Sequence, residues 1–243
     1  MRATWIPFAL ALVMSASYAR ADAGAPALVV VELFTSQGCS SCPPADALLV
    51  DLARNRPDVL PLAFHVTYWN RLGWRDPYSL DAATDRQRRY AALLPSNQVY
   101  TPQIVVDGSR DVVGSDRDRV LGAIRAATAK VATTSALASR ERDGVKIEIG
   151  AGSGAATIWL IGYDEQHRTS VTAGENGGRA LLEANIVRSF QSVGRWRGAA
   201  VQDLAPLPSG ERAAIILQQD DGRIIAAARV SDGNAGVLGL KTQ

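Results

Sequence analysis

Residues 28–46 read LVVVELFTSQGCSSCPPAD, and this stretch decides the fold of the N-terminal half. Its first seven residues form a continuous apolar and β-branched run, which predicts a strand buried in a parallel sheet. A polar loop follows and ends in a CxxC pair, Cys39 and Cys42. The leucines between residues 43 and 55 fall on one helical face. The stretch therefore predicts a strand, a CxxC pair at the turn and a helix.

The segments that follow extend this unit. Residues 59–66 (VLPLAFHV) predict a second strand, parallel to the first through a right-handed crossover. Apolar residues at helical spacing then predict a helix that ends before Pro95. The dipeptide Thr101-Pro102 precedes a hairpin with an Asp107-Gly108 turn, and a capped helix closes the half. The predicted element order over residues 24–130 is β-α-β-α-β-β-α.

The pattern changes after residue 130. Small and polar residues fill 131–143, which predicts a linker between domains. Beyond the linker, apolar and polar residues alternate, which predicts strands with one buried face. Residues 144–236 are therefore expected to form a small antiparallel, sandwich-like β domain. We expect this domain only to dock or position the first, with Arg179 and Asn185 as the first candidates if it contributes to the site.

Composition and the N-terminus narrow the class of protein. The chain has 243 residues and a net charge of +2 without a basic stripe, which argues against a nucleic-acid partner. A positive start, an apolar run and Ala19-x-Ala21 have the layout of a secretory signal, with residues 1–21 removed. Spanning a membrane takes about 20 apolar residues, more than this run supplies. We expect a periplasmic or secreted protein without a membrane span.

The two cysteines both survive this cleavage. Thiols tend to pair in an oxidising compartment, but so short a loop adds little stability through chain entropy. A structural zinc site is improbable because the chain has no other cysteine and only two histidines. The pair is therefore predicted to perform thiol–disulfide chemistry. Cys39 precedes the helix, where free N–H groups favour an anion, so Cys39 is expected to attack and Cys42 to resolve the mixed disulfide.

The element order over residues 28–130 resembles the thioredoxin superfamily. A closer resemblance is to the secreted family DUF1223, through VELFTSQGCSSCPPAD (31–46), HVTYWNRLGWRDP (65–77), YTPQIVVDG (100–108), GENGGR (174–179) and NIVR (185–188). The resemblance implies an α/β fold, with a thioredoxin-like domain followed by the β domain. It also implies a cis bond at Thr101–Pro102, next to the CxxC pair. Because Pro43 and Pro44 suit only a first helical turn, the helix is expected to begin later than in thioredoxin.

Two further side chains are candidates for the site. Thioredoxins place a buried acid near the resolving cysteine, so Glu32 is a candidate proton relay for Cys42. The alternative is an edge or outward-facing Glu32 in a salt bridge. His65 ends the second strand, at the sheet edge where Cys39 also lies. It is a candidate partner of the thiolate or an acid–base group, and the alternative is a packed core histidine.

The leading functional hypothesis is an exported thiol–disulfide oxidoreductase without a cofactor. Its partners would be protein or small-molecule thiols and disulfides, with an electron donor or acceptor that the sequence does not identify. A second hypothesis is a Cu(I) module that uses Cys39, Cys42 and His65, although both methionines lie in the signal. A third is a binding module with a vestigial CxxC pair. The Gly-rich segment 174–179 lacks phosphate-loop spacing and predicts a turn.

Overall fold

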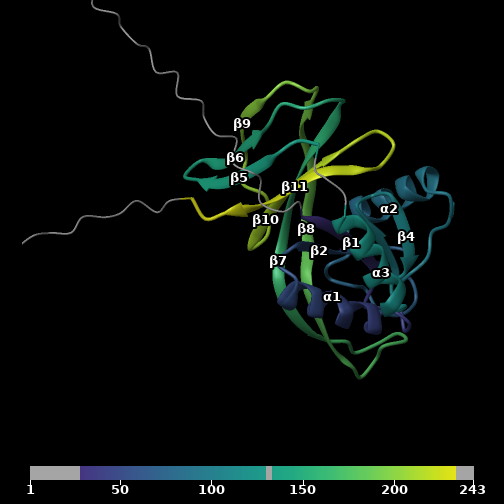
Figure 1. The fold of residues 1–243 in the computed structure, drawn as a ribbon. Helices are drawn as coiled ribbons and strands as arrows, with labels where there is room; N and C mark the ends of the chain where they lie inside the picture. The colour runs from purple at the N-terminus through teal and green to yellow at the C-terminus, as the bar shows by residue number, and fades with distance from the viewer. Residues whose placement is uncertain (1–27, 130–132, 234–243) are drawn as a thin grey trace, which may run out of the picture.

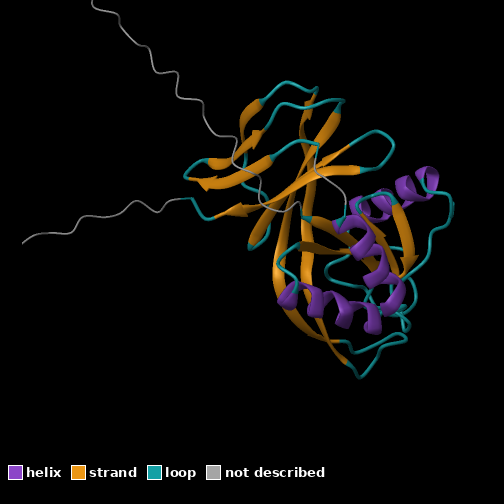
Figure 2. Ribbon diagram, in the orientation of Figure 1, coloured by secondary structure: helices purple, strands orange, loops and turns teal. Residues whose placement is uncertain are grey.

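The computed structural model describes residues 28–129 and 133–233, which form three helices and eleven strands (Figures 1 and 2). The predicted signal at 1–21 lies outside the described residues. The helices are α1 (Pro43–Asn55), α2 (Asp81–Leu93) and α3 (Arg117–Thr128). The strands are β1 (Val29–Thr35), β2 (Val59–His65), β3 (Gln103–Val106), β4 (Arg110–Val113), β5 (Ala136–Glu141), β6 (Gly144–Ile149), β7 (Ala156–Ser170), β8 (Ala180–Trp196), β9 (Val201–Ala205), β10 (Arg212–Gln218) and β11 (Ile224–Ser231).

The first half has the predicted order of elements. β1 leads through the cysteines into α1, β2 pairs with β1 in parallel, and β3 and β4 form the hairpin. The Thr101–Pro102 bond is cis, which confirms that prediction. No helix among the described residues is long and apolar enough to cross a membrane.

The expected fold class is wrong. The structure is mostly β and is not a thioredoxin-like α/β domain followed by a separate small β domain. All strands belong to one mixed sheet in the order β4-β3-β1-β2-β8-β7-β10-β11-β5-β6-β9, because β8 pairs with β2. Strand β5 also lies inside the expected linker 131–143 and pairs with β6 and β11. Strands of both halves thus continue one another across the sheet.

The distribution of core residues explains why the halves do not separate. Alternation along β1 turns Val31 and Leu33 toward α1 and α3. It turns Val30 and Phe34 to the opposite face, toward α2 and apolar side chains of β7, β8 and β10. Alternate residues of β7 and β10 pack into a third cluster with β6. Because the second of these clusters draws on both halves, separating them would expose a shared core to water.

The turn between β3 and β4 also joins the halves. Asp107 and Gly108 both have positive φ, as predicted for an Asp-Gly hairpin turn. The Asp107 carbonyl accepts from the Ile224 N–H at 2.9 Å. A Cβ on Gly108 would lie 1.9 Å from the carbonyl oxygen of Gly222, in the turn between β10 and β11. The backbones of two turns therefore touch where only glycine fits.

We expect Gly108→Ala to lower the free energy of unfolding by more than about 1 kcal/mol, because both its φ of 60° and its contact exclude a side chain. Urea unfolding followed by tryptophan fluorescence measures this loss. Gly122→Ala is the matched control, since a Cβ there lies 3.6 Å from Arg125 Nη2 within α3. It should gain about 0.5–1 kcal/mol. Equal midpoints for the two variants contradict the prediction.

Candidate functional site

The CxxC loop lies between β1 and α1. Cys39 and Cys42 are joined in a disulfide, and α1 begins at Pro43, directly after Cys42. The prolines occupy the first helical turn, where a missing N–H costs no helical hydrogen bond. The N–H groups of Ala45 and Asp46 donate to the Cys42 carbonyl, so Cys39 precedes the helix by one turn.

Polar side chains surround Cys39. The Thr101 hydroxyl donates to Cys39 Sγ at 3.4 Å, and the Ser41 hydroxyl lies 3.3 Å from the same sulfur. Trp69 Nε1 donates to Thr101 Oγ1 at 2.9 Å and thereby orients that hydroxyl. Both cysteines are fully buried, whereas Ser40 is exposed. The residue before the cis proline thus contacts the sulfur that is predicted to attack.

Glu32 does not lie in this group. It is fully buried on the opposite face of β1, where Arg86 Nε donates to its Oε1 at 2.5 Å and Tyr90 donates to its Oε2. Gln218 of β10 completes the network through Arg86 and Tyr90. The salt bridge of the alternative forms, but Glu32 is buried in β1 between β2 and β3 and lies neither at an edge nor facing outward. Its carboxylate bonds two side chains of α2.

His65 also lacks the predicted contact with Cys39. It is fully buried, and its Nδ1 lies 2.7 Å from Asp76 Oδ2. Its Nε2 faces Glu183 Oε1 at 3.7 Å, which is too long for a hydrogen bond. Asp46, one helical turn after Cys42, is buried, and its Oδ1 accepts from the Thr35 hydroxyl at 2.8 Å. These four titratable side chains, Asp46, His65, Asp76 and Glu183, are called the buried acid cluster below.

In three members of the buried acid cluster, one polar side-chain atom has a hydrogen-bond partner and the other has none. Thr35 holds Asp46 Oδ1, Asp76 holds His65 Nδ1, and Gln37 Nε2 donates to Glu183 Oε2 at 2.6 Å. The second polar atoms have no hydrogen-bond partner: Asp46 Oδ2, His65 Nε2 and Glu183 Oε1. Buried polar groups are nearly always hydrogen-bonded, so an exception at one place points to function.

The charges of the cluster shift its protonation. Burial, and then the charge of Glu183, raise the pKa of Asp46 to about 8. Burial opposes a charged His65, but Asp76 and Glu183 outweigh it and raise the His65 pKa to about 9. Burial would raise the pKa of Asp76, but the neighbouring His65 holds it below its usual range. At neutral pH, His65 and Asp76 therefore form an ion pair while Asp46 keeps its proton.

The second half of the chain contributes directly to the site. Asn176 is buried, and its Nδ2 donates to the carbonyls of Gln37 at 2.9 Å and Cys39 at 2.8 Å. Glu175 Oε2 accepts from the Ser40 N–H at 3.1 Å. The expected docking of the second half on the first therefore includes direct contacts with the backbone of the CxxC loop. Arg179 reaches the site only through Asn176, and Asn185 instead donates to the Pro61 carbonyl.

Sequence reasoning missed five of these residues, which are Asp46, Asp76, Glu175, Asn176 and Glu183, and Asp46 carries a local signal. Asp46 follows Cys42 by four positions, the spacing that places two side chains on one face of a helix. Glu175, Asn176 and Glu183 carry no comparable signal, because their partners lie more than 130 residues earlier in the chain.

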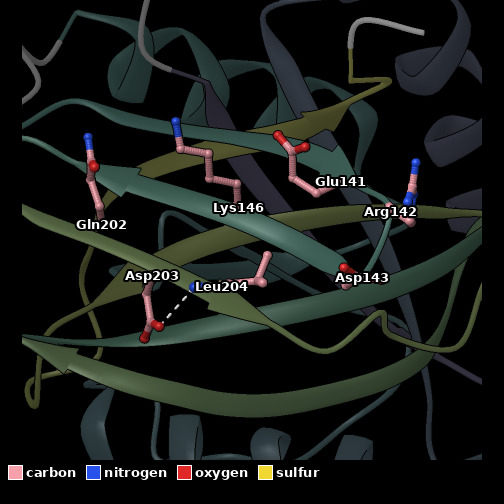
Figure 3. A pocket seen from close by; sticks show the side chains of 7 residues that line it. All are labelled: Glu141, Arg142, Asp143, Lys146, Gln202, Asp203 and Leu204. Atoms are coloured by element: carbon pink, nitrogen blue, oxygen red, sulfur yellow. Dashed lines mark hydrogen bonds between the residues drawn. The ribbon is translucent and has the colours of Figure 1, made fainter. Parts of the chain in front are cut away.

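Two other features lie apart from the cysteines. An open pocket lies over the outer face of β5, β6 and β9, at the far end of the sheet (Figure 3). It is lined by Glu141, Arg142, Asp143, Lys146, Gln202, Asp203 and Leu204. Within the described ranges, one group of side chains has metal-ligand spacing: Asp164, His167 and Glu211. The three Cu(I) candidates, Cys39, Cys42 and His65, are not brought together in such a group.

Comparisons with known proteins agree with the motifs. The family model described as "Protein of unknown function (DUF1223)" matches residues 30–219. The chain belongs to the DUF1223 family. A crystal structure from Agrobacterium tumefaciens is 31% identical, with 89% of this chain and 100% of that chain covered and a TM-score of 0.73. No curated protein matches this DUF1223 member significantly.

A second solved structure is more distant. HBP35 of Porphyromonas gingivalis is 11% identical, with 90% of this chain and 80% of that chain covered and a TM-score of 0.55. At this identity the similarity concerns the fold alone. The functional argument for the DUF1223 chain therefore rests on its own site.

Proposed function

We propose that this DUF1223 protein is an exported thiol–disulfide oxidoreductase that acts through Cys39 and Cys42. One observation carries the proposal: the disulfide lies directly before α1, with a hydroxyl on Cys39 Sγ and a buried acid one turn beyond Cys42. A disulfide across three residue steps constrains little of the unfolded chain, so reactivity explains it better than stability. Its partners are thiols and disulfides of proteins or small molecules.

The two cysteines have different roles in this proposal. When the pair is reduced, the Cys39 thiolate attacks a substrate disulfide, forms a mixed disulfide and releases one substrate thiolate. The Thr101 and Ser41 hydroxyls stabilise that thiolate by hydrogen bonding. Cys42 then loses its proton and attacks Cys39 Sγ, which restores the protein disulfide and releases the second thiolate. Two electrons pass from the dithiol to the substrate.

Asp46 takes the place that sequence reasoning gave to Glu32. The Asp46 N–H donates to the Cys42 carbonyl at 3.1 Å, so Asp46 lies one helical turn after Cys42, the residue that caps α1. Because the Asp46 pKa of about 8 is close to that of a free thiol, proton transfer from Cys42 would be nearly balanced in energy.

Cys39 is expected to be the more reactive thiol of the reduced protein. Limited alkylation at mildly acidic pH, with the labelled residue identified by mass spectrometry, should modify Cys39 at least about tenfold faster than Cys42. The wild-type protein should also equilibrate with a glutathione redox buffer. Preferential labelling of Cys42 contradicts the roles, and failure to exchange with any dithiol contradicts the function.

Export is the remaining part of the proposal. It rests on the signal-like N-terminus and on the need for an oxidising compartment. Mass spectrometry of the exported protein should find Asp22 as the first residue, and an intact Met1 in mature protein would contradict export by this signal.

A further inference from the structure

The turn that joins β7 and β8 reaches the CxxC loop from the exposed side of the molecule. We call residues 171–179 the arm tip. β7 and β8 are long strands that run past α1 before they turn (Figure 1). Glu175 of the arm tip accepts from the Ser40 N–H at 3.1 Å, and Asn176 donates to the Cys39 carbonyl at 2.8 Å. Two adjacent side chains thus hold the two residues that begin the CxxC motif.

The arm tip is fixed in place. Val171 is buried and forms backbone hydrogen bonds with Gly178 at 2.8 Å and Arg179 at 2.9 Å, which close the turn. Gly174 packs on the loop after β2, where an added Cβ would lie 3.1 Å from Trp74 Cβ. Arg179 Nη1 donates to Asn176 Oδ1 at 3.1 Å and fixes the direction of that amide. Glu175 is therefore presented to Ser40 by a packed turn.

The position of Glu175 has two electrostatic consequences for Cys39. Its carboxylate accepts from the Ser40 N–H, which is one peptide away from Cys39, and so occupies a donor next to the redox pair. It also adds a negative charge beside that thiolate, where like charges disfavour ionisation. Among the other charged groups around the loop, Asp46, His65, Asp76 and Glu183 lie on its buried side. The exposed Arg179 lies on the arm tip itself, where it donates to Asn176. Within the part of the chain that the structure describes, Glu175 is an exposed residue whose carboxylate forms a hydrogen bond with the CxxC loop.

We propose that Glu175, positioned by Asn176, limits the ionisation of Cys39 and thereby favours the disulfide over the dithiol. This inference rests on the proposed function, because it concerns the same redox pair. Stabilised thiolates make a pair more oxidising, so an anion that opposes the thiolate makes the pair more reducing. The arm tip is in this sense a tuning element that the second half of the chain supplies.

The test compares the full mature chain with its Glu175→Gln variant. Glutamine keeps an acceptor for Ser40 and removes the charge. We expect the pKa of Cys39, measured from the pH dependence of alkylation, to fall by about half a unit to one unit. The equilibrium constant with glutathione should shift about three- to tenfold toward the dithiol, where tenfold corresponds to about 30 mV. Both shifts should shrink as salt is added, because Glu175 is exposed.

The control is Glu141→Gln, an exposed glutamate of β5 at the other end of the sheet, which should change neither quantity. In an Asn176→Ala background, Glu175→Gln should lose most of its effect, because the carboxylate is no longer held at Ser40. If Asn176→Ala does not fold, the single Glu175→Gln variant still decides.

The outcomes separate the two proposals. A wild-type protein that exchanges with glutathione, together with an unchanged Cys39 pKa and redox equilibrium in Glu175→Gln, overturns the tuning role alone. A wild-type protein that exchanges with neither glutathione nor a dithiol overturns the proposed function. A shift of the Cys39 pKa in the opposite direction also overturns the tuning role.

Discussion

Replacing Arg86 with methionine is expected to lower the free energy of unfolding by about 3–5 kcal/mol, because it leaves Glu32 buried without its cation. Arg86 is buried and donates to Glu32, Gln218 and Tyr90, and its guanidinium lies 4.4 Å from the Phe190 ring centroid. Domains of this kind are stable by only about 5–15 kcal/mol. Urea unfolding followed by fluorescence should therefore show a large drop in midpoint.

A double variant separates the loss of a pair from the presence of an unpaired charge. Glu32→Gln combined with Arg86→Met removes both charges and keeps an acceptor for Tyr90, so at least about half of the lost stability should return. Arg88→Met is the matched control on α2, since Arg88 is exposed and pairs only with exposed Asp85. It should change stability by less than about 0.5 kcal/mol. A double variant that is as unstable as the sum of its singles contradicts the charge-burial explanation.

The local structure of each half was predictable from the sequence, but the joining of the two halves in one sheet was not. Strand β1, the CxxC turn, α1 and the β3–β4 hairpin are specified by neighbours in sequence: an apolar run, a helical face and an Asp-Gly turn. The pairing of β2 with β8 depends on residues more than 100 positions apart. Alternation predicts that a strand has a buried face, and it does not say which core that face joins. The period-two pattern therefore predicted the later strands and misassigned them to a separate domain.

The site divides in the same way. Cys39 and Cys42 could be found because the CxxC motif follows a predicted strand, and Thr101 and Pro102 because the resemblance to thioredoxins implies a cis bond beside that motif. Glu32 was misplaced because a buried acid on an apolar strand has two faces to choose from, and its partner Arg86 lies 54 residues away. For His65 the sequence left open a partner of the thiolate or a packed core histidine, and the structure buries it with its ring held by Asp76. The partner that each of these side chains meets lies far away in the sequence, so the local sequence does not identify it.

Replacing Asp46 with asparagine is expected to slow the resolving step about a hundredfold at pH 8. Reduced protein is mixed with glutathione disulfide, and mass spectrometry follows the adduct on Cys39. In the wild type Cys42 loses its proton to Asp46 and displaces glutathione quickly, so the adduct is brief. In Asp46→Asn the adduct should accumulate. Asp51→Asn, on the same helix but partly exposed and paired with Arg117, should behave like the wild type.

The same variant should also change how stability depends on pH. Although Asp46→Asn slows the resolving step, it should lose less stability than the wild type as pH rises. The folded pKa of Asp46, about 8, lies above its unfolded value of 3.8, so its proton stabilises the fold fully below about pH 4. That stabilisation is lost as pH rises from about 4 to 8. Asparagine has no proton to lose, so the stability of Asp46→Asn should decline less than that of the wild type over this window. If Asp46 is the proton acceptor, the variant should exchange more slowly and yet be less destabilised at alkaline pH. A variant that loses both activity and stability at pH 8 would show that Asp46 acts only through packing.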